Sequence, residues 1–268
     1  MGDPSAKATA LVTRGSRGIG AIADRLAKRG YNLILMGRSE TQRKALSARL
    51  TKETGRSVTP LRADLSDKAD LAKVEGILRD SQAITMLVNN AGIGSSTALL
   101  NTEVDKTAMI ALNITALTRL TYAAPQAFVA RSAGTIINIA SVVGISPETM
   151  VCMAQPRRMS LRSAFPCSTS LLDKGTRIQA ELPGVTATDL WEIAGLPWQK
   201  LPASIVMSPE NMVDAALVGL DQGELVIIPG LHDEDEWTHF EAARRALSRR
   251  LGNSTPAPRY GIGLPQSE

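Results

Sequence analysis

Short apolar runs alternate along this chain with longer runs in which apolar residues recur every three or four positions. The short runs are typical of β-strands and the longer ones of amphipathic helices. Nearly uninterrupted apolar runs, such as 33–36 and 136–139, suit strands that are buried on both faces. The pattern predicts strands over residues 8–13, 31–36, 58–61, 84–89, 134–140, 177–182 and 224–228. It predicts helices over residues 18–29, 41–54, 68–80, 103–131, 210–220 and 234–251.

The regular alternation of strand and helix also predicts a fold class. Successive strands joined by a helix lie parallel in one sheet, and their helices cover both faces of that sheet. We therefore expect an α/β protein with a doubly wound parallel sheet, forming a single domain over residues 1–252. The tail over residues 253–268 is rich in proline and glycine, so we expect it to be loosely ordered.

The composition indicates where in the cell the protein acts and which classes of partner it is expected to bind. The only cysteines, Cys152 and Cys167, lie fifteen residues apart without nearby histidines, which predicts neither a disulfide framework nor a zinc site and favours a cytoplasmic location. The formal net charge is +4, but the 30 basic residues are scattered among 26 acidic ones, so we expect no nucleic-acid partner. No run of about eighteen apolar residues occurs, so no membrane association is expected.

A glycine-rich segment follows the first predicted strand and opens the first predicted helix. It reads Thr13-Arg14-Gly15-Ser16-Arg17-Gly18-Ile19-Gly20. Glycines let the backbone turn tightly and approach a pyrophosphate, and the helix that follows points its positive end at the phosphates. Glycine clusters also serve ordinary turns, but ligands of doubly wound folds bind at the carboxyl ends of the strands, where this segment lies.

At this point the chain resembles the short-chain dehydrogenase/reductase family, whose fold is the Rossmann fold. Further matching residues follow successive predicted strands in the family's order. They are Asp64 and Leu65, then Asn90, Ala91 and Gly92, then Asn113, Ser141, and finally Pro183, Gly184, Val185 and Thr188. One position departs from the family pattern, because Arg14 stands where the family has its first glycine.

The resemblance assigns most of these residues to a nicotinamide cofactor. It implies that Thr13 and the segment from Gly15 to Gly20 hold the pyrophosphate and that Asp64 and Leu65 border the adenine. Asn90, with Ala91 and Gly92, is implied on the ribose and nicotinamide side. The last group, Pro183, Gly184, Val185 and Thr188, is implied near the nicotinamide amide and the phosphates.

The second predicted strand ends in Met36-Gly37-Arg38-Ser39, which has no acidic residue to bind a ribose 2′-hydroxyl. Arg38, helped by Arg17, can instead bind a 2′-phosphate through its forked guanidinium. NADP(H) is therefore expected in preference to NAD(H). A solvated arginine at this place would leave the choice open.

The catalytic residues that the family implies are only partly present. Ser141 fits the serine that polarises the substrate oxygen, and Asn113 fits the asparagine that supports catalysis through water. The family's tyrosine and lysine should stand thirteen and seventeen residues after that serine, where this chain has Ala154 and Arg158. Alanine donates no proton, and arginine does not replace a compact lysine ammonium. The same segment carries Pro156 and Pro166, which break a helix.

The genetic code offers an explanation for the missing pair. Residues 152–157 can be encoded as TGT ATG GCG CAA CCA AGG, and the same letters read from the third base give Tyr-Gly-Ala-Thr-Lys. This is the family's Tyr-x-x-x-Lys motif. We therefore expect that residues from about 152 to 174 reflect a local change of reading frame that closes by Gly175.

Two functions follow. The first is an NADP(H)-dependent oxidoreductase acting on a small-molecule carbonyl or alcohol. The resemblance implies that Trp191 and Trp198 lie in a lid over the substrate, where they indicate an apolar or bulky substrate; packing against the core is the alternative for these residues. The second is a catalytically silent dinucleotide-binding protein. A metal enzyme built on His232 and His239 is disfavoured, because no second cluster completes a coordination set and no metal is expected. A homodimer or tetramer is typical of the family, and the disrupted 152–174 segment puts it in question.

Overall fold

The computed structural model describes residues 8–14, 21–93, 107–146, 171–193 and 195–262. The chain divides into two compact units, Met1–Gly230 and Leu231–Glu268. The boundary predicted at residue 252 stays a prediction.

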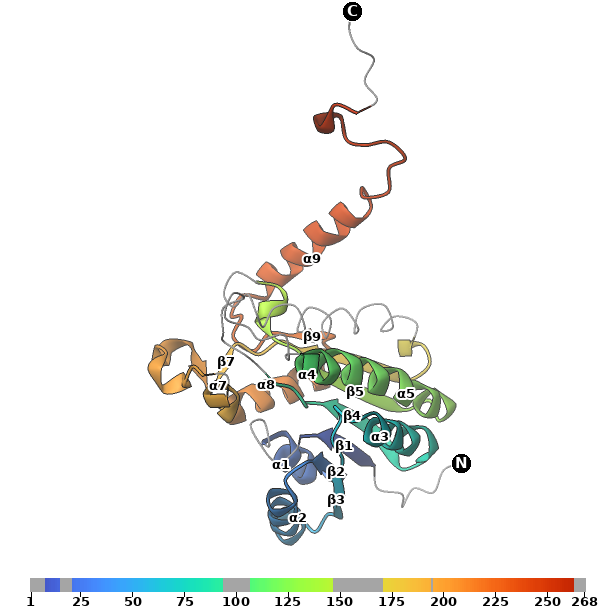
Figure 1. Cartoon of the computed structure of the whole chain (residues 1–268), viewed down its shortest axis with the longest axis vertical. Coiled ribbons are helices and arrows are strands. Elements are labelled where there is room, and N and C mark those ends of the chain that lie inside the picture. The colour runs from blue at the N-terminus through green and yellow to red at the C-terminus, as the bar shows by residue number, and fades with distance from the viewer. Residues whose placement is uncertain (1–7, 15–20, 94–106, 147–170, 194, 263–268) are drawn as a thin grey trace, which may run out of the picture. The chain divides into compact units, whose positions relative to one another are not determined.

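The first unit is built on a sheet of seven parallel strands (Figure 1). Its strands are β1 (Thr9–Thr13), β2 (Asn32–Gly37), β3 (Val58–Arg62), β4 (Ile84–Asn89), β5 (Gly134–Ile139), β6 (Thr176–Glu181) and β9 (Val226–Ile227). Their order across the sheet is β3-β2-β1-β4-β5-β6-β9, so the chain winds outward from β1 in one direction and then from β4 in the other. This order confirms the predicted doubly wound α/β fold.

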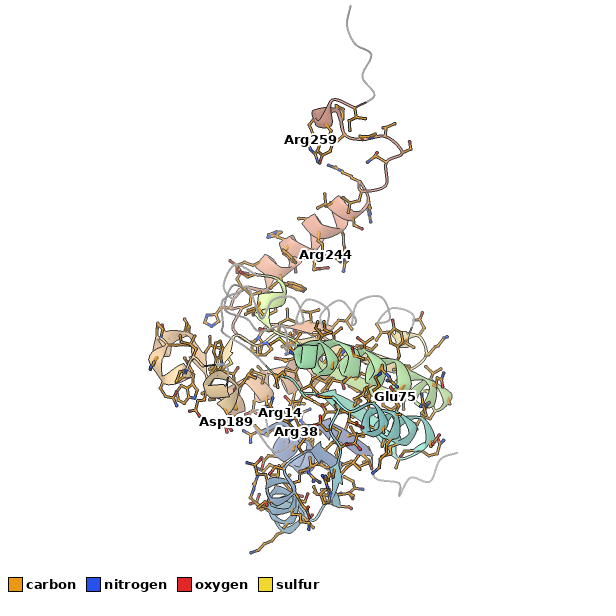
Figure 2. The ribbon with its side chains drawn as sticks, viewed as in Figure 1. Arg14, Arg38, Glu75, Asp189, Arg244 and Arg259 are labelled. Carbon is orange, nitrogen blue, oxygen red and sulfur yellow. The ribbon has the colours of Figure 1, made fainter. Side chains whose placement is uncertain are left out.

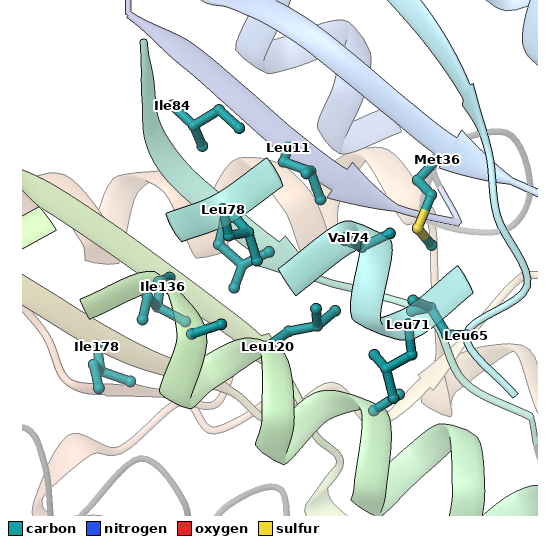
Figure 3. Packing of buried hydrophobic residues seen from close by; sticks show 14 of the residues in the cluster. Leu11, Met36, Leu65, Leu71, Val74, Leu78, Ile84, Leu120, Ile136 and Ile178 are labelled. Atoms are coloured by element: carbon teal, nitrogen blue, oxygen red, sulfur yellow. The ribbon is translucent and has the colours of Figure 1, made fainter. Parts of the chain in front are cut away.

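Helices cover both faces of the sheet. One face carries α1 (Ala21–Lys28), α2 (Glu40–Thr54) and α8 (Pro209–Gln222), and the other carries α3 (Lys68–Asp80) and α5 (Leu117–Ala130). Each face has its own core of buried apolar side chains, and Figure 3 shows the core beneath α3 and α5. Leu11, Leu78 and Leu120 in that core are fully buried. The two cores explain why most strand residues of the sequence are apolar on both sides.

Capping residues mark the beginning or the end of several of these helices. Asp67 caps α3 by accepting hydrogen bonds from the backbone of Ala69 and Asp70, and Ser208 caps α8 in the same way through Asn211. Gly55 and Gly223 end α2 and α8 in the left-handed conformation. These caps satisfy backbone groups that a helix end leaves without partners.

The helix predicted over residues 103–131 is not uniform. Its described part consists of α4 (Thr107–Ile110), a π-helix over Ala111–Ala116, and α5. A π-helix accommodates one extra residue in a turn and is common at functional sites. The apolar periodicity of the sequence did not reveal this π-turn, because the residues before and after it both contribute to one continuous buried face of the helix. Pro125 lies inside α5 without ending it.

A smaller two-stranded sheet follows β6. It pairs β7 (Val185–Thr186) with β8 (Val206–Met207), and the connection between them contains the short helix α7 (Asp189–Ile193). The second unit contains α9 (Glu234–Ser248), which ends three residues before the predicted end, and a turn of 3-10 helix over Pro258–Tyr260. Among the described residues, no helix is long and apolar enough to span a bilayer.

Candidate cofactor and active site

A cavity of about 510 Å³ opens at the carboxyl ends of β1 to β4. Parallel strands that wind in opposite directions leave a crevice at this edge, where doubly wound proteins bind ligands. The predicted residues Arg38, Asp64, Leu65 and Ala91 line the cavity. The other lining residues carry no predicted role, although Gly37, Ser39 and Ala63 follow predicted strands closely, which was a usable signal. They are Met36, Gly37, Ser39, Gln42, Ala63, Ser66, Ile93 and Leu112, together with Arg14.

Thr13 ties the end of β1 to the segment after β4. Its hydroxyl donates to the carbonyl oxygen of Val88 at 3.2 Å and accepts from the backbone N–H groups of Asn90 and Ala91, both at 2.9 Å. The side-chain amide of Asn90 donates to the carbonyl oxygen of Arg14 at 3.2 Å. These bonds hold two of the predicted cofactor segments side by side at one edge of the sheet.

Arg14, at the position where the family pattern has a glycine, adopts an unusual backbone conformation. Its φ is +54°, in the left-handed region that glycine enters most easily. The Arg14 guanidinium donates to the carbonyl oxygen of Gly92. At this position an arginine therefore adopts the backbone conformation that favours glycine, and its side chain is anchored across to the next segment.

Arg38 lies at the end of β2 with its guanidinium in solvent. The side chain is 74% exposed and approaches the Asp64 carboxylate only to 3.8 Å, a distance at which the pair contributes little to stability. Arg38 and Arg14 both border the cavity (Figure 2). Asp64 also accepts from the backbone of Ser66 at 3.0 Å, which shapes the loop after β3. A guanidinium held this loosely is available to an anionic ligand.

Asn113 lies in the π-helix and is buried. Its amide nitrogen donates to the carbonyl oxygen of Ile93 at 2.7 Å, and its amide oxygen accepts from the Ile93 N–H at 2.9 Å. This pair of bonds fastens the π-helix to the segment after β4, which borders the cavity. The extra residue of the π-turn thus coincides with a contact between two candidate site segments.

Ser141 directly follows β5 and Ala140. Its hydroxyl donates to the carbonyl oxygen of Pro183 at 3.4 Å and is 3.4 Å from the N–H of Val143. The backbone N–H of Val142 also donates to the Pro183 carbonyl, at 3.1 Å. The predicted serine and the predicted Pro183-Gly184 turn are therefore brought together by the pairing of β5 with β6.

The remaining predicted residues divide into two groups. Val185 lies in β7 and Thr188 is buried just before α7, where its carbonyl oxygen accepts from the N–H of Trp191 at 3.2 Å. The other group lies outside the described residues. It comprises Gly15, Ser16, Arg17, Gly18, Ile19 and Gly20 of the glycine segment, and residues 152–158, with Ala154 and Arg158.

A buried carboxyl group at the end of β6 had not been singled out from the sequence. Glu181 is fully buried, and neither of its carboxyl oxygens has a hydrogen-bond partner among the described residues. Burial, and secondarily the nearby carboxylate of Glu224, raise the pKa of Glu181 well above its ordinary value. The signal that could have revealed it is the alternation Arg177-Ile178-Gln179-Ala180-Glu181, which places an acid in a central strand.

The two histidines considered as metal ligands, His232 and His239, are both exposed. In the described part of the chain, no group of three or more His, Cys, Asp or Glu side chains could hold a metal ion.

Comparison with known sequences agrees with the family resemblance of the sequence motifs. Residues 8–194 match the profile of the short chain dehydrogenase family. The chain is similar to 3-oxoacyl-[acyl-carrier-protein] reductase FabG of Chlamydia trachomatis, with 31% identity over 231 residues, 82% of this chain and 92% of that protein.

Two solved structures are similar over almost their whole length. A short-chain dehydrogenase from Sphingobium yanoikuyae in complex with NADPH has 40% sequence identity and a TM-score of 0.90, covering 94% of this chain and 100% of that one. The bulky-bulky ketone specific alcohol dehydrogenase from Comamonas testosteroni has 37% identity and a TM-score of 0.87, covering 96% and 99%.

Proposed function

Since the chain belongs to the short-chain dehydrogenase/reductase family of oxidoreductases, we propose that it transfers hydride between NADP(H) and a bulky ketone or the corresponding alcohol. The single observation that carries the proposal is the cavity at the carboxyl ends of β1 to β4, lined by Arg38 and Asp64. When bound there, the nicotinamide cofactor supplies or accepts the hydride.

The cofactor preference is supported by the charge at the end of β2. The strand end Met36-Gly37-Arg38-Ser39 contains no acidic residue, and the Arg38 guanidinium is exposed beside the cavity. A ribose 2′-phosphate would find a permanent positive charge there, whereas a 2′-hydroxyl would find no acid of β2 to bind. The NADPH complex of the Sphingobium relative agrees with this preference.

The substrate class is supported by two observations of different kinds. The Comamonas relative is specific for ketones that carry two bulky groups. In this chain the segment after Gly184 contains Trp191, which is buried, and Trp198. Large apolar side chains in the segment that follows the Pro183-Gly184 turn favour a large apolar substrate over a small polar one.

The described residues would divide the catalytic work between them. Ser141 presents a hydroxyl at the end of β5, which donates to the carbonyl oxygen of Pro183 in the structure. When a substrate binds, this hydroxyl would donate its hydrogen bond to the substrate oxygen instead. Asn113, through its two bonds to Ile93, would keep the π-helix in place beside the site. Neither residue supplies the proton that a reduced carbonyl needs.

That proton donor is missing from the sequence, and we propose that a local frame change over about residues 152–174 is the cause. The shifted frame restores Tyr-x-x-x-Lys at the expected place. Resequencing the gene tests this directly. An unbroken frame that encodes the segment in expressed protein would contradict it.

We also propose a cytoplasmic location for the protein, and cell fractionation tests it.

Turnover by two forms of the protein tests the proposed function. One form is the chain with the printed sequence, and the other carries the shifted-frame residues in place of 152–174. We expect the second form to oxidise NADPH with ketones that carry two bulky groups. The first form should be about 100-fold to 10,000-fold slower, because it lacks the general acid. Equal rates in the two forms would contradict the assignment of the missing acid.

The missing tyrosine and lysine also favour a second candidate, a dinucleotide-binding protein without catalysis. Binding of NADPH is common to both candidates, so it does not separate them. Absence of turnover in both forms, with NADPH binding retained, would favour the binding protein.

A further inference from the structure

Arg14 brings a second guanidinium to the cavity at the carboxyl ends of β1 to β4. It directly follows β1 and lines the cavity together with Arg38, which follows β2 (Figure 2). Of the lining residues, the charged ones are Arg14, Arg38 and Asp64. One carboxylate therefore accompanies two guanidiniums, and the lining residues give the cavity an excess of positive charge. A hollow with this charge attracts an anionic ligand.

The place of Arg14 in the sheet indicates which part of a ligand its side chain meets. The strand order reverses between the neighbouring strands β1 and β4, so these two strands form the switch point of the doubly wound sheet. The Arg14 guanidinium donates to the carbonyl oxygen of Gly92, in the segment after β4. Its side chain therefore spans the switch point, where a bound dinucleotide crosses the sheet with its diphosphate. Arg38 lies one strand further out, at the end of β2.

The backbone of Arg14 is held in a conformation that is costly for an arginine. Its φ of +54° lies in the left-handed region, where a β-carbon is strained and a glycine is not. The side-chain amide of Asn90 donates to the Arg14 carbonyl oxygen at 3.2 Å, which helps to hold this conformation. Such strain persists where the surrounding structure enforces it, and it clusters at ligand sites. A glycine would make the same turn without strain, so an arginine adds only its side chain.

We propose that the Arg14 guanidinium binds the diphosphate of the nicotinamide cofactor, in addition to the proposed contact of Arg38 with the 2′-phosphate. This inference rests on the proposed function, because it requires a dinucleotide in the cavity. A guanidinium carries several N–H donors in one plane, so it can bond the Gly92 carbonyl and a phosphate oxygen together. NADPH and NADH share the diphosphate. Arg14 therefore strengthens the binding of both cofactors, whereas Arg38 discriminates between them.

Replacement of Arg14 in the full-length protein tests the assignment. R14M removes the charge and the bond to Gly92 but keeps a long side chain on the same backbone. We expect R14M to weaken the binding of NADPH and of NADH alike, by about 10-fold to 100-fold, in isothermal titration calorimetry. R14K keeps the positive charge and should lose less affinity than R14M. R56M is the matched control, because the Arg56 guanidinium also donates to a backbone carbonyl, that of Gly30 at 3.5 Å, but at the amino ends of β2 and β3.

The dependence of binding on salt separates a charge contact from a purely structural role of Arg14. NADH carries its negative charges on the diphosphate, so its affinity for the unchanged protein should fall as NaCl rises from about 0.05 to 0.5 M. R14M should make this fall smaller, and R56M should leave it as it is. R14G should bind NADH as weakly as R14M without a lower melting temperature, because relief of the left-handed strain offsets the lost bond to Gly92.

The outcomes distinguish this inference from the proposed function. Absence of NADPH and NADH binding by the unchanged protein would contradict the proposed function, and this inference with it. If the unchanged protein binds both cofactors and R14M keeps the same affinities or the same salt dependence, Arg14 only braces the two segments and the inference alone is overturned. A loss of affinity confined to NADPH would mean that Arg14 contacts the 2′-phosphate, and would overturn the assignment to the diphosphate.

Discussion

At the scale of single residues, the side chains that belong to the sequence motifs differ in how many hydrogen bonds hold them in place. Thr13, Asn90 and Asn113 are each fixed by two or more hydrogen bonds between segments far apart in the chain. Within the described part of the chain, Arg38 has a single long contact, with Asp64. Its part in the site is therefore electrostatic and can be removed without disturbing the scaffold.

Replacing Arg38 with alanine should weaken NADPH binding by about 10-fold to 100-fold, the value of a charge-assisted hydrogen bond, and should change NADH binding little. Isothermal titration calorimetry with each cofactor measures the two affinities. Arg62→Ala is the matched control, because Arg62 ends the adjacent strand β3, is exposed and is not among the residues that line the cavity. An equal loss for both cofactors would argue against a phosphate contact.

At the scale of elements, the position of β6 against β5 depends on the glycine that precedes it. Gly175 has a φ of +71°, and a β-carbon there would lie 2.1 Å from the carbonyl oxygen of Ser132. Ser132, after α5, itself has a φ of +52°. The turn before β5 and the turn before β6 therefore touch through their backbones, and neither can move without the other.

Gly175→Ala should accordingly lower the free energy of unfolding by about 2–4 kcal/mol, from left-handed strain together with the backbone clash. Gly55→Ala is the matched control, since Gly55 has a φ of +66° and open space around its β-carbon position. It should lose only about 1 kcal/mol. Urea unfolding followed by circular dichroism compares the two. Equal losses would mean that the contact with Ser132 relaxes.

At the scale of the whole molecule, the stability of the fold depends on pH through Glu181. The raised pKa means that the folded state keeps a proton that the unfolded state releases near the ordinary glutamate pKa, about 4.3. The folded state therefore binds more protons than the unfolded state above that pH. Stability contributed by this group is full below the ordinary pKa and falls as the pH rises through the raised value.

Glu181→Gln should remove this dependence and raise the free energy of unfolding at pH 8 by about 1–3 kcal/mol. Glu224→Gln should give a smaller gain, because it removes only the neighbouring charge and leaves Glu181 buried. Glu210→Gln, at the exposed first turn of α8, is the control and should not stabilise the protein. Unfolding measured at pH 5 and pH 8 separates these cases. A gain for Glu181→Gln that is the same at both values would contradict the proton argument.

The sequence by itself determined the strand and helix order and the fold class, because buried parallel strands and amphipathic helices leave different periodicities in the chain. It also indicated the segments at the carboxyl ends of the strands, since loops after consecutive parallel strands must meet at one edge. The tertiary structure alone decided how those segments are held together, as in the bond from Arg14 to Gly92 and the π-turn at Asn113. It also decided the burial of Glu181. The physical reason is that periodicity records which face of an element is apolar, whereas hydrogen-bond partners, desolvation and free surface depend on what the rest of the chain brings beside it.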